Sequence, residues 1–356
     1  MDMTALVLLV AGLVLLVAGA EVLVRGASRI AVLLRISPLI IGLTIVAYGT
    51  SAPEMAVSIQ SNLAGEAGIS IGNVVGSNIV NVLLILGISS VVVPLVVAEQ
   101  LIRLDVPIMI GVSVLLPFLA LDGNLGKLDG LLLFSGAIAY TLFLLFQGRE
   151  EDLDVDTTTG TSRSLRPWVT NFAMVGVGIA MLTLGSNWLV AGAITLAEAI
   201  GVSNLVIGLT VVALGTSLPE LVTSVVASLK GERDMAVGNV IGSNIFNLLA
   251  VLGVASLLSP GGIDVSAAAM NFDIPVMIAV AVACLPIFFS GNVISRWEGW
   301  MFLAYYAAYT TYLILQATDH DALPIFSRML IGFVIPLTVI TLVTIVWRSY
   351  KRREGG

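Results

Sequence analysis

The chain has 356 residues, of which 58% are hydrophobic and 11% are charged, whereas soluble domains carry about a quarter of charged residues. This composition excludes an ordinary soluble domain and predicts an all-α polytopic membrane protein with no nucleic-acid partner. The single cysteine, Cys284, and the single histidine, His320, are too few for a disulfide framework or a soft-metal site, and no cofactor is expected.

Hydrophobic runs of about 20 residues, each long enough to cross roughly 30 Å of hydrocarbon, occur eleven times. They fall near residues 3 to 24, 36 to 62, 69 to 95, 104 to 121, 129 to 147, 167 to 190, 203 to 229, 235 to 258, 272 to 290, 298 to 317 and 325 to 347. The first run is expected to be a mature helix rather than a signal peptide, because no positive charge precedes it.

The basic residues predict the orientation of these spans. With the N-terminus outside, fourteen lysines and arginines fall on the inner side, and only Lys127 and Arg328 fall on the outer side. Because positive charge marks cytoplasmic loops, we expect a multi-pass protein of the inner (plasma) membrane with a cytoplasmic C-terminus.

Landmarks of the first half recur 166 positions later, as Gly19 and Leu23 do at Gly185 and Leu189. Each copy holds five spans, an odd number, so the second copy must enter the membrane in the opposite sense. We therefore expect two inverted five-helix repeats plus one extra C-terminal helix, as in many secondary transporters. The expected parts are a first repeat (1–147), an acidic cytoplasmic linker (148–166), a second repeat (167–317), an extra transmembrane helix (325–347) and a basic cytoplasmic tail (348–356).

Each repeat carries the same two polar motifs. They read GTSAPE from Gly49, GNVVGSNIVN from Gly72, GTSLPE from Gly215 and GNVIGSNIFN from Gly238. Each copy places a carboxylate, Glu54 or Glu220, in apolar sequence without an intramembrane lysine or arginine as partner. Because burying an unpaired charge in a membrane is costly, these two residues are the strongest candidates for a functional site.

On a continuous helix, Thr50 and Ser51 share the face of Glu54. Pro53 is expected to bend or open that helix and to release carbonyls nearby, such as that of Ala47. The second repeat offers the same arrangement at Thr216, Ser217, Pro219, Glu220 and Ala213.

The partner helix of the first repeat supplies Ser77 and Asn81 on one face, and Gly72 with Gly76 forms a seam that permits close helix approach. The second repeat matches it with Ser243, Asn247, Gly238 and Gly242. All these donors are hard oxygens, which suit Ca²⁺ or Na⁺ rather than zinc or copper. Two glutamates balance one divalent ion, and without it they should take up protons or sodium, which is a physical basis for exchange.

Plainer roles are favoured for other polar residues. Glu21 lies close to Arg25, and an interfacial ion pair is expected there. Asp105 and Asp273 lie near span ends, where helix capping is expected. Helix joining is the expected role of Asn78 and Asn244.

At these motifs the sequence resembles the alpha repeats of the sodium/calcium exchanger branch of the calcium/cation antiporter superfamily, of prokaryotic type. The resemblance covers nearly the whole chain except the last helix. It implies ion ligands at Glu54, Glu220, Thr50, Ser51, Ser77, Thr216, Ser217, Ser243 and the carbonyls of Ala47 and Ala213, with Asn81 and Asn247 lining the central position. It also implies alternating access by sliding of the first and sixth helices.

The chain departs from two branches of that superfamily. Potassium-dependent relatives carry an aspartate where this chain has Asn247, and cation/proton relatives carry a glutamate where it has Gly76 and Gly242. Potassium dependence and proton coupling are therefore not expected.

These observations predict an antiporter that exports Ca²⁺ in exchange for Na⁺ within a lipid bilayer. A Ca²⁺/H⁺ antiporter of the same fold and a cation channel, which conducts without a counter-ion, remain alternatives. An intramembrane enzyme is disfavoured because the spans hold no histidine or lysine to activate a serine.

Overall fold

The computed structural model describes residues 3 to 150, 165 to 289, 291 to 336 and 339. Within the first half, helices, short π-helical segments (η) and two short strands follow one another from α1 to α8. They are α1 (Met3–Leu34), α2 (Pro38–Ile41), η1 (Gly42–Val46), α3 (Ala47–Thr50), α4 (Ala52–Leu63), α5 (Ala67–Val80), η2 (Asn81–Leu86), α6 (Gly87–Val92), β1 (Leu95–Val96), η3 (Leu101–Asp105), α7 (Val106–Leu119), β2 (Asn124–Leu125) and α8 (Lys127–Glu150).

The second half runs through the same order of elements. They are α9 (Arg166–Ala199), α10 (Asn204–Ile207), η5 (Gly208–Val212), α11 (Ala213–Gly215), α12 (Leu218–Leu229), α13 (Arg233–Phe246), η6 (Asn247–Val251), α14 (Leu252–Leu258), β3 (Ile263–Asp264), η7 (Ala269–Asp273), α15 (Ile274–Phe289), β4 (Val293–Ile294) and α16 (Arg296–Ala317). The extra C-terminal helix begins as α17 (Leu323–Met329) and η8 (Leu330–Val334). Most of the expected linker, the second part of the extra helix and the basic tail lie outside the described residues.

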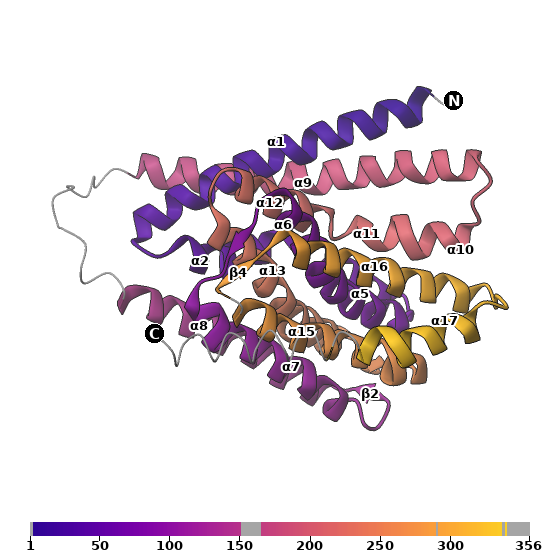
Figure 1. Cartoon of the computed structure of the whole chain (residues 1–356). Coiled ribbons are helices and arrows are strands. Elements are labelled where there is room, and N and C mark those ends of the chain that lie inside the picture. Colours follow the sequence, from indigo (N-terminus) through magenta and orange to yellow (C-terminus); the bar gives the residue numbers. More distant parts are fainter. Residues whose placement is uncertain (1–2, 151–164, 290, 337–338, 340–356) are drawn as a thin grey trace.

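The equivalent helices α1 and α9 lie side by side along one edge of the molecule and run in opposite directions (Figure 1). A Cβ on Gly12 would lie 2.6 Å from the amide nitrogen of Leu189, and one on Gly26 would lie 3.0 Å from the carbonyl oxygen of Asn171. Glycine thus lets the two backbones touch. Because corresponding helices are antiparallel, the two repeats are inverted, as predicted.

The helices that carry the GN motifs form the centre of the fold. In the stretches Gly68–Val92 and Arg233–Leu258, 78% and 83% of the most apolar window is buried, against 33% in α1 and 28% in α9. The strands join the repeats to each other, because β1 pairs with β4 and β2 pairs with β3, both antiparallel. The outer helices therefore enclose a core built equally from both repeats.

The chain is a nearly all-helical, multi-pass membrane protein. Seven helices in the described part have the length and composition to cross a bilayer, or eight if the bent pair Pro38–Thr50 and Ala52–Leu63 is one span. These helices leave the prediction of eleven spans undecided, because shorter, interrupted or less apolar helices are not among them.

Candidate functional site

Each GTS motif lies at a break between two helices. Ser51 separates α3 from α4 with φ −83° and ψ 9°, and the helix axis bends by 42° there. In the second repeat α11 ends at Gly215 and α12 starts at Leu218. The predicted break is confirmed, and the proline of each motif lies in the first turn of the helix after the break, where its missing N–H costs no hydrogen bond.

The break places both glutamates in the first turn of a helix, Glu54 in α4 and Glu220 in α12. The free N–H groups and the helix dipole at such an end favour negative charge. Both side chains are only 1% exposed. The expectation that Thr50 and Ser51 share one continuous helix face with Glu54 was wrong, since the helix ends between them.

The hydroxyls of each GTS motif instead reach the opposite repeat. Ser51 Oγ donates to Glu220 Oε1 at 2.9 Å, and Ser217 Oγ approaches Glu54 Oε1 at 3.4 Å. Each carboxylate is therefore bound by the serine that precedes the other carboxylate. These crossed hydrogen bonds bring the two predicted acidic residues together in one buried region between the repeats.

An asparagine from the GN motif supports each carboxylate-bearing helix. In the first repeat Asn73 Nδ2 donates to the carbonyl oxygen of Glu54 at 3.1 Å and to Ser58 Oγ at 3.0 Å. Its Oδ1 accepts from Thr216 Oγ1 at 3.5 Å. Asn73 thus joins its own repeat to the hydroxyl of the other.

The second repeat has the same arrangement. Asn239 Nδ2 donates to the carbonyl oxygen of Glu220 at 3.5 Å and to Ser224 Oγ at 3.0 Å, while its Oδ1 accepts from Thr50 Oγ1 at 3.1 Å. Sequence reasoning did not select Asn73 or Asn239. The signal was present, because both occupy the second position of the repeated GN motifs.

Four asparagines join the centre of the two repeats. Asn78 Nδ2 donates to the carbonyl oxygen of Asn244 at 3.1 Å, and Asn244 Nδ2 donates to that of Asn78 at 3.4 Å, which confirms their helix-joining role. Asn81 Nδ2 donates to Asn244 Oδ1 at 2.9 Å, and Asn247 Nδ2 donates to Asn78 Oδ1 at 3.1 Å. The amide nitrogens of Asn81 and Asn247 are thereby fixed, and their oxygens face away from these bonds.

Several buried oxygens of the predicted ligand set have no hydrogen-bond partner. Within the described residues they are Glu54 Oε2, Glu220 Oε2, Asn81 Oδ1, Asn247 Oδ1 and Ser243 Oγ. Buried polar atoms normally find a partner, so such a group calls for an explanation. The donor set is rich in carboxylate, amide and hydroxyl oxygens, which fits a hard cation such as Ca²⁺ or Na⁺ as substrate.

The backbone carbonyls at the breaks differ from expectation in the first repeat. The carbonyl oxygen of Ala47 is not released, because it accepts from Ser51 N at 3.0 Å and from Thr50 Oγ1 at 3.4 Å. Pro53 cannot remove this bond, since the carbonyl four residues before it is that of Gly49. At the second break the backbone N–H of Ser217 donates to the carbonyl oxygen of Leu214 at 3.1 Å, and not to the carbonyl oxygen of Ala213.

The two glycine seams also differ. A Cβ on Gly238 would lie 2.9 Å from the carbonyl oxygen of Leu39, whereas a Cβ on Gly72 meets no atom of the described residues within 4 Å. The predicted close approach is thus present for the second seam and absent for the first in this structure. We call the side where α2, η1 and α3 meet α13 the packed side, and the equivalent side of α10, η5, α11 and α5 the open side.

Two further expectations concern residues outside the site. The ion pair of Glu21 with Arg25 is confirmed, and Lys230 Nζ joins it at 3.0 Å. The prediction that Asp105 and Asp273 cap helices was wrong. Each carboxylate instead accepts a hydrogen bond from a tyrosine that is distant in the sequence. The partners are Tyr140, at 2.8 Å from Asp105, and Tyr309, at 3.1 Å from Asp273.

Comparison with known proteins gives concordant matches. The family model described as sodium/calcium exchanger protein matches residues 4–146 and 170–315. The chain is 41% identical to a putative antiporter, CaxA, of Alkalimonas amylolytica over 80% of this chain and 89% of that protein. It is 35% identical to the sodium/calcium exchanger MaX1 of Methanosarcina acetivorans over 81% and 92%. A solved structure of the sodium-calcium exchanger NCX_Mj, soaked with Na⁺ and Sr²⁺, superposes with a TM-score of 0.74 at 31% identity, covering 86% of this chain and 97% of that chain.

Proposed function

This chain belongs to the sodium/calcium exchanger family, and from that membership we propose that it exports Ca²⁺ in exchange for Na⁺. The observation that carries the proposal is the pair of buried carboxylates, each bound by a serine of the other repeat and each with one oxygen left without a partner. The proposed orientation has the N-terminus outside, because this places most basic residues in the cytoplasm.

Charge balance favours exchange over simple release. Glu54 and Glu220 together carry two negative charges in a region that excludes water, and a bound Ca²⁺ neutralises both. Releasing it without a replacement leaves two buried, unpaired carboxylates, which is strongly unfavourable. Refilling the site with Na⁺ avoids that state, so emptying is coupled to loading of the counter-ion.

We propose further ligands beside the two carboxylates. They are the side chains of Thr50, Ser51, Ser77, Asn81, Thr216, Ser217, Ser243 and Asn247, with the carbonyl of Ala213. The carbonyl of Ala47 is left out of this set, because it already accepts two hydrogen bonds. Ser51 and Ser217 would each contact an ion while binding a carboxylate of the opposite repeat. An ion held this way couples the repeats mechanically, because it is bound by both.

Sodium is proposed as the counter-ion rather than a proton for two reasons. Asn247 supplies an uncharged amide at the centre, so the site holds two carboxylates and not three. Gly76 and Gly242 place no titratable side chain beside it. The site therefore lacks the additional carboxylates that the proton-coupled and potassium-dependent relatives carry at these positions, which favours Na⁺ as the counter-ion.

The test is Ca²⁺ flux in proteoliposomes under imposed sodium, potassium and proton gradients in turn. We expect uptake driven by sodium, and we expect Glu54→Gln and Glu220→Gln each to abolish it, because one carboxylate cannot balance Ca²⁺. Glu99→Gln is the matched control, since Glu99 is an exposed carboxylate paired with Arg103 at 2.5 Å. Its uptake should equal that of the unaltered chain.

Each contrary result has a distinct meaning. Full uptake in either glutamine variant at the site would refute the shared carboxylate pair. Uptake driven only by a proton gradient would make the chain a Ca²⁺/H⁺ antiporter, and Ca²⁺ flux with no counter-ion gradient dependence would make it a channel.

A further inference from the structure

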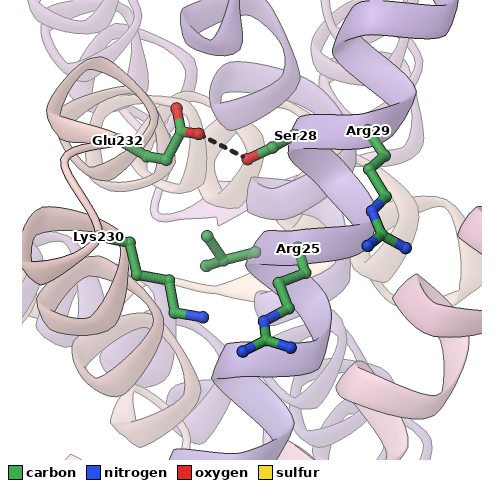
Figure 2. Close-up of a pocket in the computed structure, with 6 residues that line it drawn as sticks. Arg25, Ser28, Arg29, Lys230 and Glu232 are labelled. Carbon is green, nitrogen blue, oxygen red and sulfur yellow. Dashed lines mark hydrogen bonds between the residues drawn. The ribbon is translucent and has the colours of Figure 1, made fainter.

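A cavity with charged side chains in its lining lies apart from the buried carboxylates, in the C-terminal part of α1. It has a volume of about 390 Å³ and is lined by Val24, Arg25, Ser28 and Arg29 of α1 and by Lys230 and Glu232 of the turn that joins α12 to α13 (Figure 2). Three cationic side chains and one carboxylate therefore line it. An anionic group is the ligand that such a lining favours.

The carboxylate of this cavity is turned away from two of the cations. Glu232 Oε1 accepts from Ser28 Oγ at 3.0 Å, and Figure 2 shows this pair apart from the side chains of Lys230 and Arg25. Glu232 is thus held by a neutral hydroxyl instead of neutralising a cation. The cationic groups keep their charge for another partner.

The side chains of Arg25 and Lys230 converge on one point. Both bind Glu21 Oε1, Lys230 at 3.0 Å, and Glu21 is itself 41% exposed. Arg29 has only a contact with Met174 Sδ at 3.8 Å within the described residues, and sulfur is a weak acceptor. The half-exposed carboxylate of Glu21 is therefore shared by two cations, and Arg29 has no carboxylate partner among the described residues. The cavity keeps a net positive charge.

A row of exposed apolar side chains on α1 leads towards the cavity. Val10, Val14 and Val17 are exposed, and the same helical face continues to Glu21 and Arg25. From Val17 to Arg25 the helix rises by about 12 Å. A lipid whose chains lie on the valines thus places its headgroup near the arginine.

An aromatic anchor marks the same level on α9. Trp168 stacks on Phe172 with ring centroids 6.2 Å apart, one to two turns from Met174, which Arg29 contacts. Tryptophan is enriched at the headgroup level of membranes. Helix α9 thus supports the placement of the cavity at the membrane surface.

The inverted repeat shows that the fold does not need these cations. At the equivalent positions, 166 residues away, Arg25 corresponds to Ala191, Arg29 to Thr195 and Lys230 to Ala64. The same helices pack there without any of the three charges. Because the repeats are inverted, these three charges stand on the predicted cytoplasmic side and the equivalent positions face outside, so the cations lie where they can meet anionic headgroups.

We propose that this cavity binds the phosphate of an anionic phospholipid, which bridges Arg25 and Arg29 of α1 to Lys230 of the turn between α12 and α13. Basic pockets between transmembrane helices are suited to lipid phosphates. The turn leads directly into α13, whose glycines lie against α2 and η1 on the packed side. Bound lipid therefore ties α1 to the packed side and favours that arrangement.

The test is native mass spectrometry of the purified full chain titrated with phosphatidylglycerol, with phosphatidylcholine as the neutral comparison. Arg29→Gln and Lys230→Gln should each weaken phosphatidylglycerol binding about fivefold, since each basic residue near a membrane contributes about 1 kcal/mol. Arg103→Gln is the matched control, because it removes an exposed arginine paired with Glu99 outside the cavity. It should leave binding unchanged.

Glu21→Gln separates lipid binding from a structural role. It removes the carboxylate that competes for Arg25 and Lys230, so phosphatidylglycerol should bind more tightly, whereas a purely structural salt-bridge cluster would give no gain. Equal binding in the unaltered chain and the Arg29→Gln, Lys230→Gln double variant would overturn the proposal. Displacement of the lipid by glycerol phosphate at equal affinity would overturn its assignment to a lipid, because a soluble phosphate would then suffice.

Discussion

The two sides of the carboxylate pair are built from nearly the same sequence but are packed differently. On the packed side a Cβ on Gly242 would lie 2.7 Å from the carbonyl oxygen of Leu43, whereas on the open side a Cβ on Gly76 meets no described atom within 4 Å. Thr44 is 4% exposed, and its counterpart Thr210 is partly exposed. The repeated motif is therefore compatible with two packing states, one on each side of the site.

This difference indicates how the site is reached. The glutamates are enclosed on the packed side by helix contact through glycine, and no such contact is present on the open side among the described atoms. Since the glycine motifs agree, the open side carries the small residues that the close packing of the other side uses. We expect ions to enter from the open side in this arrangement and to leave by the other after the two sides have exchanged their packing.

The largest expected effect comes from filling the two seams. Gly242→Val should destabilise the fold by about 3 kcal/mol or more, because the added carbons meet the backbone of Leu43. Gly76→Val should leave the unfolding temperature in detergent almost unchanged, yet it should slow sodium-driven Ca²⁺ exchange about a hundredfold by preventing closure of the open side. Normal exchange by Gly76→Val would show that the open side never adopts the packing seen opposite.

The sequence predicted the repeats, the breaks and the carboxylate cluster, because each depends on local residue types or on the fixed spacing of 166. Pro53 and Pro219 lie in the first turn of the helices that follow the two breaks. The sequence did not predict which side is packed, because Gly76 and Gly242 occupy equivalent positions in nearly identical motifs. That choice is made by tertiary contacts. The wrong capping assignment of Asp105 has the same cause, since Tyr140 lies 35 residues away.

A smaller effect is expected from the tyrosines that bind the two aspartates. Asp105 is fully buried, and Tyr140→Phe would leave it only the contact with Gln100 Nε2 at 3.3 Å within the described residues. We expect a loss of about 1–3 kcal/mol in the free energy of unfolding. Asp273 is partly exposed, so water can replace the hydroxyl of Tyr309, and Tyr309→Phe should cost less than Tyr140→Phe. Denaturant unfolding of both variants in the same detergent measures the difference, and a greater loss for Tyr309→Phe would contradict the role given to the different burial of Asp105 and Asp273.

The smallest expected effect concerns the aromatic pair that lies on one side only. Tyr48 stacks on Phe246 with ring centroids 4.2 Å apart and hydrogen-bonds to Thr141, whereas its counterpart in the second repeat is Leu214. An aromatic pair contributes about 0.5–1.5 kcal/mol beyond its buried area. Tyr48→Leu should therefore shift the equilibrium between the closed and the open arrangement of the packed side towards opening by about two- to tenfold.

Thiol labelling measures this shift. With Cys284→Ser as background, a cysteine replacing Thr44 should react faster in the Tyr48→Leu variant by that factor, because opening of the packed side exposes it. The reciprocal change Leu214→Tyr is the control, because Val80 stands where Phe246 does and offers no ring to stack on. An unchanged labelling rate in Tyr48→Leu would mean that the glycine seam alone holds the packed side closed. A rate change in Leu214→Tyr equal to that in Tyr48→Leu would show that side-chain size at this position, and not ring stacking, sets the balance between the two sides.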